Sequence, residues 1–151
     1  MIDRIENTFA SPSSVQIEQC EHQLGVSFPD SYREFLCSTN GGNPFPKLIN
    51  VANAGDVLID FLYGVSGNDQ PGDLIFEQRK AQELDPLPDG LIVIGHDPGG
   101  NRFLLETCGE KCGCIFYWDS ASFFPRSSTE EGNTYFVAES MEDFLEMARY
   151  A

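Results

Sequence analysis

Three cysteines lie close enough together in the chain to bind a metal ion: Cys108, Cys112 and Cys114. Thiolates are ligands for Zn²⁺, and a closed zinc site needs about four ligands, usually supplied as closely spaced pairs. Here the spacing is irregular, and a fourth ligand would have to arrive through folding from Cys20, Cys37 or His96. The alternative is a set of ordinary reduced thiols beside the end of a strand. We adopt that alternative and expect neither a metal nor a cofactor.

His96 and Asp97 are residue types that transfer protons in general acid–base catalysis. Neighbouring residues of an extended chain point to opposite faces, which suits a catalytic pair poorly. Asp97 also precedes Pro98, as an aspartate often does in a turn. No G-x-S-x-G, H-E-x-x-H or Walker pattern occurs in the sequence. We therefore expect a protein without catalytic residues, and keep a small enzyme built on this corner as the alternative.

Acidic side chains are the third group that could act together. Asp and Glu number 24 against nine Lys and Arg, which gives a formal net charge of −15. That charge disfavours direct binding to nucleic acid or to an anionic membrane and permits a basic partner. The candidate partner-binding residues are Asp56, Asp60, Asp69, Asp73, Glu77 and Asp119, with Glu130 and Glu131 near the last of them in sequence. The alternative for each is a solvated surface carboxylate.

The element that must position these residues covers 91–119. Three apolar runs, 91–94, 103–105 and 115–118, alternate with turn-forming clusters rich in glycine, and this pattern predicts an antiparallel meander. Gly99 and Gly100 lack the lysine and the following helix of a phosphate-binding loop. Trp118 is expected to be half-buried in a strand that Asp119 ends, in preference to serving as a binding hot spot.

Helices are predicted before and after this meander. A serine- and proline-rich start at 11–14 precedes Ile17, Cys20 and Leu24 on one helical face, and Gly25 suits the left-handed end. A second helix follows Pro29, has an apolar face, and is stopped at Asn40-Gly41-Gly42. Asp73 is a plausible cap for a helix running to Leu84. Ser140 begins a C-terminal helix whose apolar face is formed by Met141, Phe144, Leu145 and Ala148.

The remaining segments are expected to be less regular. Residues 1–10 suggest a short lead-in helix or a loose arm, and the two prolines within 43–46 indicate a turn without a regular element. Alternating apolar residues predict one strand over 55–66 and a last short strand over 135–137. Residues 120–133 form a long connection, with 127–132 the segment expected to be most mobile. We expect one domain over 1–151, without repeats or linkers.

The cellular compartment is predicted from the N-terminal segment, the hydropathy of the chain and the number of cysteines. The segment 1–10 carries charges and no apolar core of a signal peptide, and no run of residues is as long as a membrane span. Five cysteines is an odd number in a chain large enough to build its own core, which favours a reducing environment. We expect a cytoplasmic protein without membrane attachment. The oligomeric state stays open.

An ordered set of residues resembles the SUKH superfamily. Its N-terminal part reads Ile17-(x)6-Leu24-Gly25-(x)2-Phe28-Pro29-(x)2-Tyr32-(x)2-Phe35-Leu36-(x)3-Asn40-Gly41-Gly42. Its later part comprises Ile94-Gly95-(x)4-Gly100-Asn101, then Ile115-Phe116-Tyr117-Trp118-Asp119, then Phe144-Leu145. The match covers roughly residues 12–148 and consists largely of helix caps and core positions. The three-cysteine turn is a departure from the family pattern.

The resemblance implies an α+β fold, with a curved, mainly antiparallel sheet surrounded by an N-terminal helix pair and a C-terminal helix. The superfamily includes bacterial immunity proteins related to the fungal Smi/Knr regulators of cell-wall synthesis. Many members neutralise a polymorphic toxin, often a nuclease, and the family has no common catalytic residues. The resemblance therefore implies a non-enzymatic immunity protein whose partner is a cognate protein toxin, which the charge of −15 predicts to be basic. A regulatory scaffold is the further alternative that the fungal relatives suggest.

Overall fold

A five-stranded antiparallel sheet with the order β5-β6-β7-β8-β9 forms the centre of the protein. The computed structural model describes residues 1–84, 86–119 and 134–151. The strands of this sheet are β5 (Phe61–Leu62), β6 (Leu91–His96), β7 (Arg102–Glu106), β8 (Ile115–Trp118) and β9 (Thr134–Ala138). The predicted meander is confirmed as β6-β7-β8, and the last strand is confirmed as β9. The expected connection over 120–133, with Glu130, Glu131 and the mobility predicted for 127–132, lies outside the described residues.

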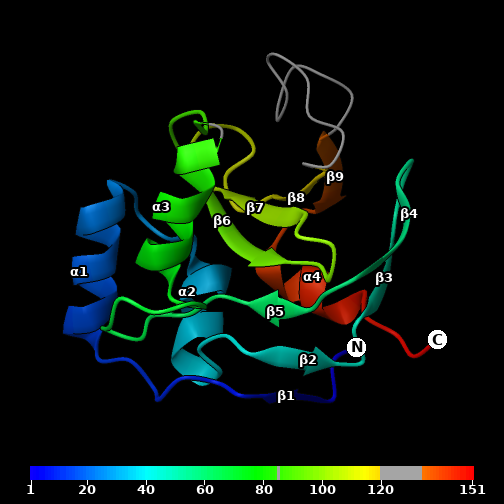
Figure 1. Ribbon diagram of the computed structural model, residues 1–151, viewed down its shortest axis with the longest axis horizontal. Coiled ribbons are helices and arrows are strands. Elements are labelled where there is room, and N and C mark those ends of the chain that lie inside the picture. Colours follow the sequence, from blue (N-terminus) through cyan, green and yellow to red (C-terminus); the bar gives the residue numbers. More distant parts are fainter. Residues whose placement is uncertain (85, 120–133) are drawn as a thin grey trace.

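Four helices surround the sheet in the described part of the chain, which confirms the α+β class. They are α1 (Ser14–Leu24), α2 (Asp30–Ser38), α3 (Leu74–Leu84) and α4 (Met141–Glu146). Figure 1 shows α3 between α1 and β6, at the edge of the sheet where the short β5 ends. On another side, α4 packs on the sheet through Phe144, whose ring centroid lies 5.3 Å from that of Phe103. None of the described helices has the length and apolar character that a bilayer span requires.

The helix caps explain why the helices begin where they do. Ser13 and Gln16 form a reciprocal capping box at α1, so the helix begins at Ser14, within the predicted start at 11–14. Asp73 accepts hydrogen bonds from the backbone N–H groups of Ile75 and Phe76 at the start of α3. Ser140 accepts one from Asp143 at α4. The predicted caps at Asp73 and Ser140 are therefore confirmed.

The predicted apolar helix faces form much of the core. Ile17 and Cys20 of α1 are buried, as are Met141 and Phe144 of α4 and the nearby Ala148. In α2 the buried residues are Tyr32, Phe35 and Leu36, and the Tyr32 ring contacts both Phe28 and Phe35. Trp118 was expected to be half-buried, and this is wrong, because it is 1% exposed. It belongs to β8, an interior strand that pairs with β7 on one side and β9 on the other.

Two small sheets were not predicted. β1 (Arg4–Glu6) pairs with β2 (Asn43–Phe45), and β3 (Leu48–Val51) pairs with β4 (Gly55–Leu58). The lead-in helix or loose arm expected over 1–10 is therefore wrong, and so is the irregular turn expected over 43–46. Pro44 is accommodated because it lies in a two-stranded sheet, where one side of each strand needs no ladder hydrogen bond.

The single strand expected over 55–66 is divided in the structure. The backbone N–H of Ile59 donates to Lys47, whereas that of Asp60 donates to His96. The chain therefore leaves the small sheet and joins the central sheet between these two residues. Alternating apolar residues continue through this point of the sequence, and for that reason the pattern could not reveal the change of partner.

The Asn40-Gly41-Gly42 segment ends α2 and ties three parts of the chain together. Gly41 and Gly42 have φ angles of 81° and 115°, which confirms the predicted helix stop. Asn40 is buried, and its side-chain amide donates to the carbonyls of Ala10 and Val65 and accepts from the N–H of Val65. One side chain thus holds together the end of α2, the segment before α1 and the chain after β5.

Gly42→Ala is expected to lower the free energy of unfolding more than Gly25→Ala. A Cβ at Gly42 would overlap the carbonyl oxygen of Glu6 in β1, whereas a Cβ at Gly25 would meet nothing within 4 Å. Both positions have positive φ, so both substitutions carry a strain of about 1–2 kcal/mol, and only Gly42→Ala adds a steric cost of about 1–3 kcal/mol. Urea unfolding of the two variants measures the difference, and equal losses would contradict the predicted close approach.

Candidate functional site

A polar depression of about 240 Å³ lies where α3 meets the ends of β5, β6 and β7, and we call it the polar corner. Two of the acidic candidates, Asp60 and Glu77, reach it together with His96. Tyr63 and Arg102, which were not predicted from the sequence, also line it. The register of β5 on β6, with Phe61 opposite His96, brings Asp60 and His96 together. Local sequence patterns cannot predict the register of two strands that lie so far apart in the chain.

His96 pairs with Asp60 and Tyr63 rather than with its sequence neighbour Asp97. Its Nε2 lies 3.4 Å from Asp60 Oδ2, and its Nδ1 lies 2.8 Å from the Tyr63 hydroxyl. Burial, followed by the negative charge of Glu77, raises the pKa of Tyr63 far above its ordinary value, so this hydroxyl keeps its proton. A neutral hydroxyl can donate to Nδ1 or accept from it, according to the tautomer of the His96 ring.

Asp97 organises the turn between β6 and β7, as predicted. One carboxylate oxygen accepts from the backbone N–H groups of Gly99 and Asn101, both at 2.9 Å. The other accepts from the Asn101 side chain and, at 2.7 Å, from the Tyr117 hydroxyl. Burial and the hydrogen bond to Asp97 raise the pKa of Tyr117. Acid–base chemistry at this corner would therefore have to use Asp60 and His96, and not the predicted pair.

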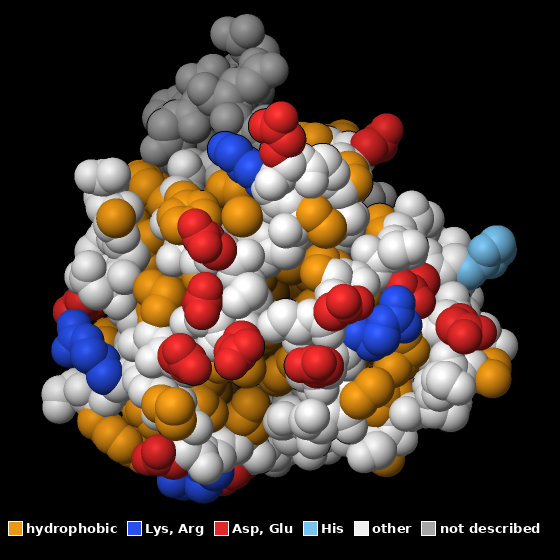
Figure 2. Space-filling model, turned by 180° about the vertical axis from the view of Figure 1, so that it is seen from behind, with side chains coloured by type: hydrophobic (Ala, Val, Ile, Leu, Met, Phe, Trp, Pro, Cys, Tyr) orange, Lys and Arg blue, Asp and Glu red, His pale blue; other side chains and the backbone are white. Residues whose placement is uncertain are grey.

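The remaining acidic candidates are distributed over separate elements. Asp73 is buried, and besides capping α3 it accepts from Ser66, so it cannot present its carboxylate to a partner. Asp69 and Asp56 are exposed and form ion pairs with Arg79 and Arg149, at 2.6 and 3.3 Å. Asp119 is partly exposed directly after β8. Figure 2 shows that acidic side chains on the back of the molecule are likewise spread among apolar and uncharged ones.

In the turn that contains Cys108, Cys112 and Cys114, two of the thiols form weak hydrogen bonds to oxygen atoms. The Cys108 thiol lies 3.7 Å from Glu106 Oε1, and the Cys112 thiol donates to the Thr107 carbonyl at 3.3 Å. Desolvation and nearby carboxylates, Glu106 and Glu139 respectively, raise the pKa of Cys108 and of Cys114. A raised pKa favours the thiol over the thiolate that a metal requires. Within the described ranges, no group of three or more His, Cys, Asp or Glu side chains is arranged to hold a metal ion.

Cys20 is expected to react with iodoacetamide far more slowly than Cys37 in the folded protein. Burial raises the pKa of Cys20 to about 12, with smaller contributions from the charges of Asp73 and Glu21, whereas Cys37 is exposed. Because the thiolate is the nucleophile, labelling of Cys20 at a pH of about 8 should require unfolding. Mass spectrometry of the digested protein measures both rates, with labelling in denaturant as the control. Equal native rates would contradict the buried position.

Comparison with known proteins gives two matches. The model of a family described as the SMI1 / KNR4 family (SUKH-1) matches residues 11–147. A Bacillus subtilis (strain 168) protein named "Uncharacterized protein YnaB" is 29% identical over 115 residues. The alignment covers 74% of this chain and 64% of that protein, so the chain spans slightly less than two thirds of the length of this curated relative.

Proposed function

The chain belongs to the SMI1/KNR4 family (SUKH-1), and from this premise we propose that it is an immunity protein that neutralises a polymorphic toxin by direct binding. The family includes immunity proteins. In this proposal the protein is not an enzyme, acts in the cytoplasm as a single SUKH-like domain, and does not contact nucleic acid itself. Its partner is a basic toxin, such as a nuclease.

The observation that carries this proposal is the charge of −15 on a member of this family. A nuclease grips phosphates with a basic face, and an acidic surface would meet that face, attract it and occupy it. The proposed contact residues are the exposed or partly exposed Asp56, Asp60, Asp69 and Asp119, together with the half-buried Glu77, whose carboxylate also accepts from the backbone N–H of Gly72. Asp73 is left out because its carboxylate is buried and caps α3.

The polar corner offers two of these carboxylates in one place. Asp60 and Glu77 line the same depression although they come from the start of β5 and from α3. The Asp60 side chain is 42% exposed and its Oδ2 lies 3.4 Å from His96 Nε2, so a lysine or arginine of a partner can still approach it. Asp69, which is 71% exposed, lies in the loop that leads to α3. We infer that this side of the molecule contacts the toxin first.

Capture from the native host tests the proposal. The tagged protein is incubated with lysate of cells that carry its gene neighbourhood, and bound proteins are identified by mass spectrometry. The expected result is a basic protein whose expression alone arrests growth and whose effect is relieved by co-expression of this chain. Failure to relieve the arrest caused by the neighbouring toxin would overturn the proposal. Turnover in a broad hydrolase screen that is lost in His96→Ala would instead favour the small-enzyme alternative.

A further inference from the structure

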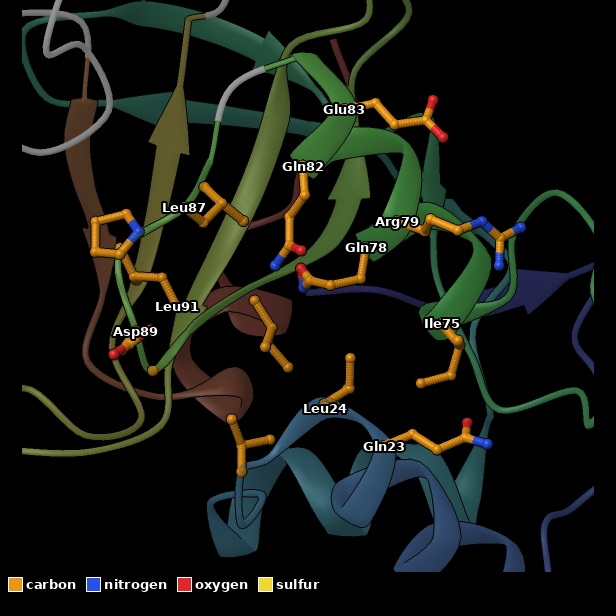
Figure 3. A pocket seen from close by; sticks show the side chains of 14 residues that line it. Gln23, Leu24, Ile75, Gln78, Arg79, Gln82, Glu83, Leu87, Asp89 and Leu91 are labelled. Carbon is orange, nitrogen blue, oxygen red and sulfur yellow. The ribbon is translucent and has the colours of Figure 1, made fainter.

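An open pocket of about 530 Å³ lies between α1, α3 and the segment that leads into β6 (Figure 3). This volume is within the range of about 300–1,000 Å³ that is usual for ligand sites. Leu24 from α1, Ile75 from α3 and Leu91 from β6 give it an apolar floor. Polar side chains of α3 extend into it from one side, among them the amides of Gln78 and Gln82. The sequence analysis did not predict this pocket.

Gln78 supplies an unused hydrogen-bond donor at this pocket. The side chain is 5% exposed, and its Oε1 accepts from the backbone N–H of Val93 at 3.0 Å. The short strand β5 pairs only with Gly95 and His96 of β6 and does not reach Val93. The Gln78 side chain therefore accepts the hydrogen bond that a longer neighbouring strand would accept from Val93. This bond fixes the orientation of the amide. Nε2 is then buried without a hydrogen-bond partner among the described residues, which is unusual in a native protein.

Gln82 lies beside Gln78 at this pocket. It follows Gln78 by one helical turn on the same face of α3, and Figure 3 shows both side chains extending into the same hollow. Gln82 is exposed, so its side chain can change rotamer at little cost. Such a movement would open Nε2 of Gln78 to an acceptor group that enters the pocket.

The mouth of the pocket is acidic. Glu83 and Asp89 line it on opposite sides and are exposed. Arg79 also lines the pocket, but its guanidinium is bound to Asp69 at 2.6 Å, so its charge is already balanced. The pocket therefore combines an apolar floor, a buried amide donor and a negative rim.

We propose that this pocket binds a basic peptide segment of the protein partner. A backbone carbonyl of the segment accepts from Gln78 Nε2, and an apolar side chain covers Leu24, Ile75 and Leu91. A neighbouring lysine or arginine pairs with one of the two rim carboxylates, Glu83 or Asp89. An extended peptide presents a backbone carbonyl acceptor next to an apolar side chain, which matches the donor and the apolar floor of the pocket. The negative rim favours a peptide that is basic. The inference rests on the proposed function, because the partner that supplies the segment is the basic toxin.

The test is a nuclear magnetic resonance titration of the isotope-labelled protein with the dipeptide acetyl-Leu-Arg-amide. The expected result is a saturable shift of the Gln78 side-chain amide signals and of the Ile75 and Leu91 methyl signals. Acetyl-Leu-Glu-amide, with the opposite charge, should bind roughly tenfold more weakly or not at all. No saturable shift, or equal binding of the two dipeptides, would overturn the proposal.

Variants at exposed positions provide the controls. Gln82→Trp fills the pocket from α3 and should abolish the shifts, and Gln82→Lys, which adds a positive charge at the same position, should weaken binding if the first variant does not fold. Glu83→Gln with Asp89→Asn should weaken binding several-fold, whereas the matched pair Glu18→Gln with Glu110→Gln removes the same charge from exposed positions outside the pocket and should not. Binding retained in Gln82→Trp overturns the proposal.

The two proposals fail differently. If wild-type protein captures the toxin and folded Gln82→Trp captures it equally well, the pocket inference is overturned and the immunity function stands. If the dipeptide binds as expected but the neighbouring toxin is not neutralised, the immunity function is overturned and the peptide site stands.

Discussion

Association with the cognate toxin should slow by roughly an order of magnitude or more when ionic strength rises from low to physiological values. The cause is the formal charge of −15, which attracts a basic partner over distances longer than any contact. Steered association reaches about 10⁸–10⁹ M⁻¹s⁻¹ at low salt, and charges at the rim of an interface act mainly on that rate. Stopped-flow mixing of the two proteins over a series of salt concentrations measures it.

Charge reversal locates the surface that produces this effect. Asp60→Lys with Asp69→Lys should slow association further and change dissociation little, because both side chains are accessible and their ion pairs are worth only about 0–1 kcal/mol. Glu18→Lys with Glu110→Lys makes the same change in net charge at other exposed positions. Equal slowing by the two pairs would show that only total charge matters. An association rate that does not depend on salt would leave −15 as a feature of solubility.

Phe35→Ala should lower the free energy of unfolding by about 3–5 kcal/mol, a large share of the 5–15 kcal/mol that is typical of a folded domain. Phe35 is 4% exposed, and its ring lies 6.0 Å from that of Tyr32, which in turn contacts Phe28. Removing the ring leaves a cavity between α2 and the elements that it covers. Chemical denaturation followed by tyrosine and tryptophan fluorescence measures the loss.

Glu34→Ala is the matched control, because Glu34 precedes Phe35 on α2 and points to solvent. Its effect should stay within about 0.5 kcal/mol, since an exposed side chain that caps nothing contributes little to stability. If Phe35→Ala shifted the unfolding midpoint no more than Glu34→Ala, α2 would not pack as described.

Local patterns in the sequence were sufficient to predict the helices and the meander. The face of Tyr32, Phe35 and Leu36 requires only helical periodicity, and the ends of α1 and α2 require only residues that accept positive φ. The strands β6, β7 and β8 are joined by short turns, so their pairing follows from their order along the chain.

Pairing between distant segments could not be predicted in the same way. β1 and β2 have three residues each, and nothing in either segment indicates the other. The candidate site shares this difficulty, because the pairing of His96 with Asp60 depends on the register of β5, a strand of two residues. Asp73 shows the converse case. The cap was predicted correctly, but a residue that caps a helix in a buried position is thereby removed from the acidic surface.

The bonds of Asn40 also bear on the chemical ageing of the protein. In an Asn-Gly sequence such as Asn40-Gly41, the glycine backbone nitrogen can attack the side-chain amide carbon of the asparagine and displace ammonia. Water then opens the resulting cyclic imide to aspartate or isoaspartate. In the folded protein the Asn40 amide is held by Ala10 and Val65, away from that attack. Each period in the unfolded state exposes it, and an aspartate at this position has no amide protons to donate to the two carbonyls. Molecules that unfold for long enough should therefore lose the ability to refold, so that the deamidated fraction of a stored sample records how much time its molecules have spent unfolded.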